Sequence, residues 1–106
     1  MGVIAMENIF SIKENNAYID VLINQTFSIL PLYEEDKNSK FLSQKITNLT
    51  YRLNGFFKIN DFDTNITIDI LALVNELGTF ENHAKVRNCV LRVCSLLSRL
   101  RVVVEE

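Results

Sequence analysis

The chain has 106 residues, of which 48% are hydrophobic and 23% are charged, and its formal net charge at pH 7 is -2. This length allows one hydrophobic core, and the apolar fraction argues against an intrinsically disordered chain. The slightly acidic balance disfavours a dedicated nucleic-acid-binding protein, because such proteins are usually basic. The composition therefore predicts a single globular domain over residues 1–106.

The opening residues lack the basic start and apolar run of a secretory signal, and no charge-free stretch reaches the roughly 18 residues that a membrane span needs. Two cysteines, Cys89 and Cys94, lie five positions apart in a predicted helix. They would point about 140° apart, so they cannot form a disulfide within that helix. We therefore expect buried, reduced thiols in a cytoplasmic protein that does not contact a membrane.

Residues 1–15 are too apolar for a free tail, and two interpretations stay open: a short docking helix, or an arm that packs on a second subunit. Asn15 or Asn16 is a suitable N-cap for the helix that follows. Pro31 lacks an N–H and clashes with the preceding turn, which predicts a kink there or an end of the helix near Ile29. The apolar residues of this first main helix are Tyr18, Ile19, Leu22, Ile23, Phe27, Leu30 and Tyr33.

A polar turn over residues 34–39 precedes a second predicted helix that begins near Ser39. The Asn54-Gly55 pair predicts the end of this helix, because both residues tolerate the left-handed backbone of a helix terminus. Beyond it, Phe56, Phe57, Ile59 and Phe62 would form a small apolar cluster in the connection. The apolar stripe of the helix itself consists of Leu42, Ile46, Leu49, Leu53 and Phe56.

Asp63 or Thr64 is expected to cap a third helix, and Gly78 to end it in the left-handed conformation. Asp61, Asp63 and Asn65 match the start of a calcium loop, but the loop glycine and the final glutamate are absent, so turn formation and capping explain these residues better. The apolar stripe of the third helix consists of Ile66, Ile70, Leu73 or Val74, and Leu77.

The last predicted helix runs from about Asn82 to Val104, with Thr79 or Asn82 as its cap, and has the clearest periodicity in the chain. The turns between helices are short, which favours antiparallel neighbours. The sequence thus predicts an all-α fold: a small antiparallel helical bundle of three to four main helices over residues 16–104, preceded by the N-terminal arm or short helix. The stripe of the last helix consists of Val86, Val90, Val93, Leu97, Leu100 and Val104.

No group of residues in the sequence predicts a catalytic, cofactor-binding or metal site. His83 is the only histidine, and we expect it on the surface in the first turn of the last helix. It lies six positions from Cys89, with no third residue evident to orient its ring for catalysis. One histidine and two poorly spaced cysteines do not supply four zinc ligands. We therefore expect a protein that is not an enzyme and uses no cofactor or metal.

The outer side of the last helix carries apolar and small residues where a solvated helix would be polar, and Ile68, Leu71 and Ala72 do the same on the third helix. A helix that is apolar on two sides is either central in its domain or covered by another chain, and a short chain can surround few helices. Basic residues seven positions apart flank this outer stripe. The predicted interaction residues are Lys85, Leu91, Arg92, Ser95, Ser98, Arg99 and Val102.

These patterns favour a non-enzymatic protein-interaction module, such as a small regulator, inhibitor, immunity-type protein or adaptor, that acts through helix faces. We expect it to form a homo-oligomer, most simply a dimer, and to bind another protein. The alternative is a nucleic-acid-associated regulator that uses the basic edge made by Lys85, Arg92 and Arg99. A third hypothesis, an enzyme or small-ligand binder, would need a pocket near Tyr18, Tyr33, Tyr51 and Cys94.

Overall fold

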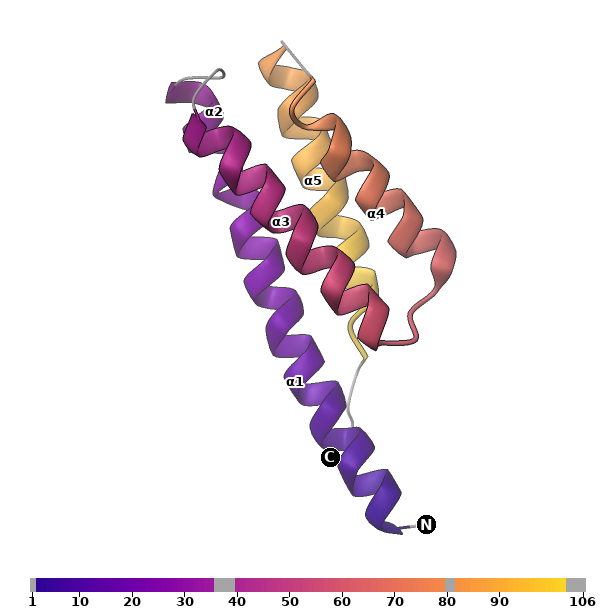
Figure 1. Cartoon of the computed structure of the whole chain (residues 1–106). Coiled ribbons are helices and arrows are strands. Elements are labelled where there is room, and N and C mark those ends of the chain that lie inside the picture. Colours follow the sequence, from indigo (N-terminus) through magenta and orange to yellow (C-terminus); the bar gives the residue numbers. More distant parts are fainter. Residues whose placement is uncertain (1, 36–39, 80–81, 103–106) are drawn as a thin grey trace.

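A computed structural model of the protein describes residues 2–35, 40–79 and 82–102, with side chains from residue 12 onward. Within these ranges all regular structure is helical, as the sequence predicts (Figure 1). The chain forms α1 (Gly2–Phe27), α2 (Ile29–Glu35), α3 (Lys40–Ile59), α4 (Thr64–Glu76) and α5 (His83–Arg99). No described helix combines the length and the apolar character needed to cross a membrane.

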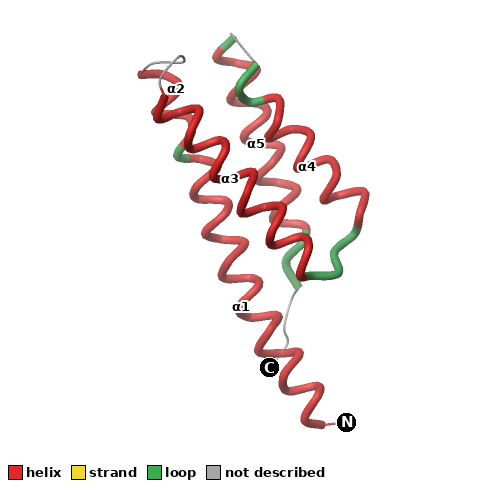
Figure 2. Tube along the Cα trace, in the orientation of Figure 1, coloured by secondary structure: helices red, strands yellow, loops and turns green. Residues whose placement is uncertain are grey.

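The four longer helices run alternately in opposite directions, so each is antiparallel to the helices it packs on (Figure 2). α1 packs on α5 and more loosely on α3, while α4 packs on both α3 and α5. The diagonal pairs are therefore α1 with α4 and α3 with α5. The short α2 continues α1 and contacts both α3 and α5. This arrangement confirms the predicted small antiparallel bundle.

The core is built mainly from the predicted stripes. On α5, the residues Val86, Val90, Val93 and Leu97 have no exposed surface and Leu100 is buried, whereas Val104 lies outside the described residues. The other three long helices contribute fully buried side chains from the predicted positions as well. These are Ile19 and Leu22 from α1, Leu53 from α3, and Ile70 and Val74 from α4.

α1 differs from the prediction because it begins at Gly2 and includes residues 2–15 of the segment that was expected to be a separate arm or short helix. Asn15 and Asn16 lie within α1 and are not its caps. Their side chains bond to distant parts of the chain instead: the Nδ2 of Asn15 donates to the Oδ1 of Asn60 at 2.7 Å. No proline and no internal glycine interrupts residues 3–27, so nothing in the chain ends the helix at the asparagines.

The interruption predicted at Pro31 is present, and it falls at Ser28, between α1 and α2. Pro31 is the third residue of α2 and has no N–H to donate to the carbonyl of Phe27, four residues earlier. The hydroxyl of Ser28 donates to the carbonyl of Gln25 at 2.6 Å, which is a common feature of bent helices. The break also changes which side of the chain is buried: Ile29 is 1% exposed, whereas Phe27, a predicted core residue, is 41% exposed.

Both predictions of a left-handed glycine are wrong, because no described residue has a positive φ. α3 continues through Gly55 to Ile59, and α4 ends in a right-handed turn in which the N–H of Leu77 donates to the carbonyl of Val74, before Gly78 is reached. A glycine inside a helix costs about 1 kcal/mol relative to alanine. In α3, the burial of the next residue, Phe56, offsets that cost.

The predicted side-chain caps of the last two helices are confirmed. The Oδ1 of Asp63 accepts the N–H of Asn65 at 2.9 Å, and the Oδ1 of Asn82 accepts the N–H of Ala84 at 2.8 Å. These bonds satisfy N–H groups that have no partner within the helix. The predicted start of the second helix at Ser39 lies outside the described residues.

Candidate functional site

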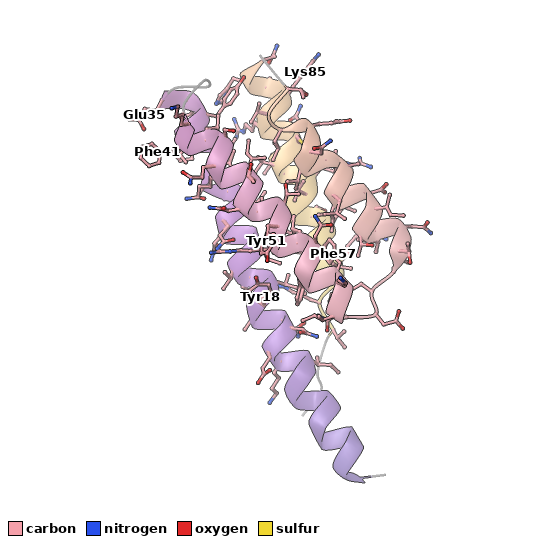
Figure 3. All side chains as sticks on the ribbon, in the orientation of Figure 1. Tyr18, Glu35, Phe41, Tyr51, Phe57 and Lys85 are labelled. Atoms are coloured by element: carbon pink, nitrogen blue, oxygen red, sulfur yellow. The ribbon has the colours of Figure 1, made fainter. Side chains whose placement is uncertain are left out.

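The predicted interaction residues of α5 all reach the surface. We define the α5 face as six of them, all exposed: Lys85, Leu91, Arg92, Ser95, Ser98 and Arg99. The large apolar side chain at the middle of this face, Leu91, is 45% exposed. Figure 3 shows Lys85 at one end of α5, near the turn that follows α4. α5 therefore combines a fully buried inner stripe with a mixed apolar and basic outer face.

Val102 does not belong to this face, because α5 ends at Arg99 and Val102 lies in the non-helical segment that follows. Its side chain is 48% exposed, but its backbone is fixed on α1. The Nδ2 of Asn16 donates to the carbonyl of Val102 at 2.7 Å, and the N–H of Val102 donates to the Oδ1 of Asn16 at 3.1 Å. One asparagine side chain thus takes the place of the helical partners that a longer α5 would have supplied.

The charges of the α5 face have no counter-ions in the described part of the chain. The neighbouring Arg101 pairs with the carboxylate of Asp20 on α1. No acidic side chain of the described residues forms an ion pair with Lys85, Arg92 or Arg99. The α5 face therefore offers a row of cations beside an apolar side chain, which suits a partner with acidic groups.

A second surface feature, an open groove between α1 and α3, was not among the predicted interaction sites. One part has a volume of about 540 Å³ and is lined by Tyr18, Tyr51, Phe56 and Ile59. The rings of Tyr18 and Phe56 lie 4.9 Å apart between centroids, and both line this part of the groove. A smaller part of about 370 Å³ lies further along the same two helices. The groove follows from the loose packing of α1 on α3.

The lining of the groove can be compared with the third hypothesis, which required a pocket near Tyr18, Tyr33, Tyr51 and Cys94. It brings together Tyr18 of α1 and Tyr51 of α3, which lie on one side of the molecule in Figure 3. Tyr33 and Cys94 are buried elsewhere in the bundle and do not line it. The predicted four-residue pocket is thus only half assembled. Tyr51 and Ile59 lie off the core stripe of α3, and these unburied apolar positions were the available signal for the groove.

The two cysteines are free and buried, as predicted. The Sγ of Cys89 lies 3.2 Å from the carbonyl oxygen of Leu73, and the Sγ of Cys94 lies 3.8 Å from that of Ile23. Burial raises the pKa of both thiols to about 11, and the charge of Glu76 adds to the shift at Cys89. Such thiols are protonated at neutral pH, which suits packing rather than nucleophilic chemistry.

His83 lies on the surface in the first turn of α5, also as predicted. Its Nε2 is 2.8 Å from the Oε1 of Glu34, so it joins α5 to α2. Its ring centroid is 6.0 Å from that of Tyr33. In the described ranges, no group of three histidine, cysteine, aspartate or glutamate side chains is arranged to hold a metal ion.

Comparison of the chain with protein-family models, curated proteins and solved structures finds no significant match.

Proposed function

We propose that the protein is a non-enzymatic interaction module that binds another protein through the α5 face, and that it acts as a homo-oligomer in the cytoplasm. The observation that carries this proposal is the exposure of Leu91, at 45%, beside a row of cations that have no ion pair in the described structure. Two free buried thiols support a reducing compartment. The partner is expected to present acidic residues around an apolar contact.

The composition of the α5 face is typical of a small binding epitope. Arginine and large apolar side chains carry most of the free energy of protein–protein binding, and surrounding neutral residues exclude water from them. Here Arg92 directly follows Leu91, and Ser95 and Ser98 lie one and two turns further along the helix. The serines would leave room for a partner side chain to reach Leu91, while the arginines would orient it.

The experiment compares three proteins: the wild type, Leu91→Asp, and the control Thr47→Asp. Thr47 is exposed on α3, which is diagonal to α5, so the control adds the same charge elsewhere. A partner captured from host extract is purified, and its Kd for each protein is measured by calorimetry. We expect Leu91→Asp to weaken binding about 30-fold or more, as loss of a central contact does, and Thr47→Asp to leave the Kd unchanged.

An equal Kd for the wild type and Leu91→Asp would show that the α5 face is not the binding site. A second candidate function is nucleic-acid binding, which the exposed Lys85, Arg92 and Arg99 favour. It predicts a DNA or RNA mobility shift at low salt that disappears steeply as salt is added. A shift that is lost when these three residues are changed to alanine would replace the protein-binding proposal.

A further inference from the structure

The bundle ends on α1 at two hydrogen-bonded asparagines. Asn15 bonds to Asn60, just after α3, and Asn16 bonds to Val102, just after α5. The part of α1 before them, Gly2–Glu14, extends past the ends of the other helices (Figure 1), and we call it the overhang. The long axis of the molecule is 52 Å. The twenty residues of α3 account for roughly 30 Å of it at about 1.5 Å per residue.

The overhang is apolar for a solvated helix. Glu7 is the one charged residue among positions 2–12, which include Val3, Ile4, Met6, Ile9, Phe10 and Ile12. An isolated helix of this length is not stable in water, and a helix with apolar residues on several sides is normally covered by other structure. No other described helix runs beside the overhang in Figure 1 or Figure 2. We therefore expect other structure to bury the apolar residues of the overhang, and no described helix of the same chain does so.

The groove between α1 and α3 begins where the overhang ends. Two of its lining side chains are almost fully exposed in the single chain, Tyr51 at 81% and Ile59 at 80%. Asn15, the first residue after the overhang, also lines it. The groove is long enough to reach Gln25, near the end of α1, through its second, smaller part. It thus runs beside the same part of α1 that follows the overhang.

The overhang and the rest of α1, which borders the groove, have the same length. The overhang, Gly2–Glu14, and the rest of α1, Asn15–Phe27, are each thirteen residues long. If two copies of α1 cross antiparallel near Glu14, each overhang lies along Asn15–Phe27 of the other copy, beside that copy's groove. In a dimer with a two-fold axis, each overhang would pack against the groove of the other copy, and the two contacts would form one closed interface. One chain therefore supplies both halves of the interface, which favours a second copy over an unrelated partner.

The charges agree with this register. With the crossing near Glu14, Glu7 falls opposite Val21 of the other copy. Asn15 and Asn60 lie at one level of the antiparallel α1 and α3, so Arg52 lies within one helical turn of the level of Val21. Arg52 lines both parts of the groove. Glu7, the one charged residue among positions 2–12, is thus brought near a cation of the groove.

We infer that the protein forms a two-fold symmetric dimer in which the overhang of each copy lies in the α1–α3 groove of the other. This inference deepens the proposed function, since it names the surface of the proposed homo-oligomer, but it does not use the α5 face. The dimer leaves both α5 faces, which lie on a different helix, open to a further partner.

The first test is the mass of the full chain in solution, measured by light scattering during size-exclusion chromatography. We expect the wild type at twice 12.2 kDa, and both Ile59→Asp and Phe10→Asp at 12.2 kDa. Ile68→Asp is the matched control, because Ile68 is 58% exposed on α4, which does not border the groove. It should keep the dimer mass. Circular dichroism establishes that each variant is still helical.

A wild type that stays at 12.2 kDa at its highest soluble concentration would overturn the inference. So would a dimer that dissociates in Leu91→Asp but persists in Ile59→Asp, because the α5 face would then be the dimer interface. Failure of the proposed function is a separate result, namely partner binding that does not depend on Leu91.

The second test measures the register with the double variant Glu7→Cys/Val21→Cys and a short bismaleimide cross-linker. The two positions lie about 21 Å apart along one α1, so a short cross-link between them must join two copies. We expect a covalent dimer from this pair and little from Glu7→Cys/Ile68→Cys. Equal cross-linking of both pairs would contradict the register. Phe10-dependent binding of a monomer to phosphatidylcholine–phosphatidylglycerol vesicles would instead assign the overhang to a lipid surface and overturn the dimer.

Discussion

Two cysteines and one asparagine show how single side chains contribute to this bundle. Cys89 and Cys94 occupy core positions of α5, and each thiol approaches a backbone carbonyl of a neighbouring helix. Asn16 holds the backbone of Val102 through both ends of its amide group. Such contacts stabilise by about 1 kcal/mol each, so they adjust the packing of the helices rather than create the fold.

The raised pKa of the two thiols predicts slow reaction with a thiol reagent in the folded protein. At pH 8 a pKa of about 11 leaves about one thiol in a thousand ionised, compared with about one in ten at the ordinary value of 9.0. We expect reaction with dithiobisnitrobenzoate to be about 100-fold slower than for the urea-unfolded chain. Equal rates would contradict the burial of both thiols.

The same shifts have a defined effect on stability. The pKa of each thiol is higher in the folded state than in the unfolded state, so folding favours the protonated form. The contribution of the thiols to the free energy of unfolding is therefore fully present below pH 9 and decreases as the pH rises toward 11. The decrease should be smaller in Cys89→Ala/Cys94→Ala, which provides the control.

At the scale of the helices, the predicted caps of α4 and α5 mark helix starts, whereas neither predicted glycine adopts the left-handed conformation of a helix end. Asp63 and Asn82 begin α4 and α5 as predicted, because each accepts an N–H two residues later that has no other partner in its helix. Gly55 does not end α3, since the chain gains the burial of Phe56 by staying helical. A glycine permits a helix end without requiring one.

The cap of α5 can be tested by Asn82→Ala. We expect the free energy of unfolding to fall by about 1 kcal/mol, because the N–H of Ala84 loses its acceptor. Asn75→Ala, at an exposed position inside α4, is the control and should cost nothing, since alanine is the better helix former. Urea denaturation followed by circular dichroism measures both. A loss of less than a few tenths of a kcal/mol would show that α5 does not depend on this cap.

For the whole molecule, stability depends on the apolar core shared by the four longer helices. The described ion pairs, Arg101 with Asp20 and His83 with Glu34, are half-exposed and contribute little in water. The core, in contrast, holds twelve large side chains with less than 2% exposure among the residues that the structure describes. A domain of this size has a total stability of about 5–15 kcal/mol, so one core side chain can be a large fraction of it.

Leu53→Ala tests this view against its neighbour Asn54→Ala. Leu53 has no exposed surface, and its truncation should lower the free energy of unfolding by about 2–5 kcal/mol through lost burial and a cavity. Asn54 is exposed, about 100° around α3 from Leu53, and its replacement should change the value by less than about 0.5 kcal/mol. Similar losses in the two variants would mean that α3 is not oriented as described.

The helical class, the core stripes of the last helices and the caps of α4 and α5 were determined by the sequence itself. These features depend on residues within one or two turns of each other, so their periodicity and capping chemistry are visible without the fold. The exposure of the α5 face was predictable for the same reason. The groove was not, because it depends on how closely two helices pack.

The features that the sequence did not predict depend on contacts between residues that are distant in the sequence. Asn15 and Asn16 look like caps in the sequence, yet they bond to residues 45 and 86 positions away and lie inside α1. α3 continues through Gly55, and the next residue, Phe56, packs its ring on Tyr18 of α1. The overhang exists because α1 is continuous while the other helices end beside its middle. The residues that make these hydrogen bonds and ring contacts come from separate segments of the chain, and only the tertiary structure brings them together.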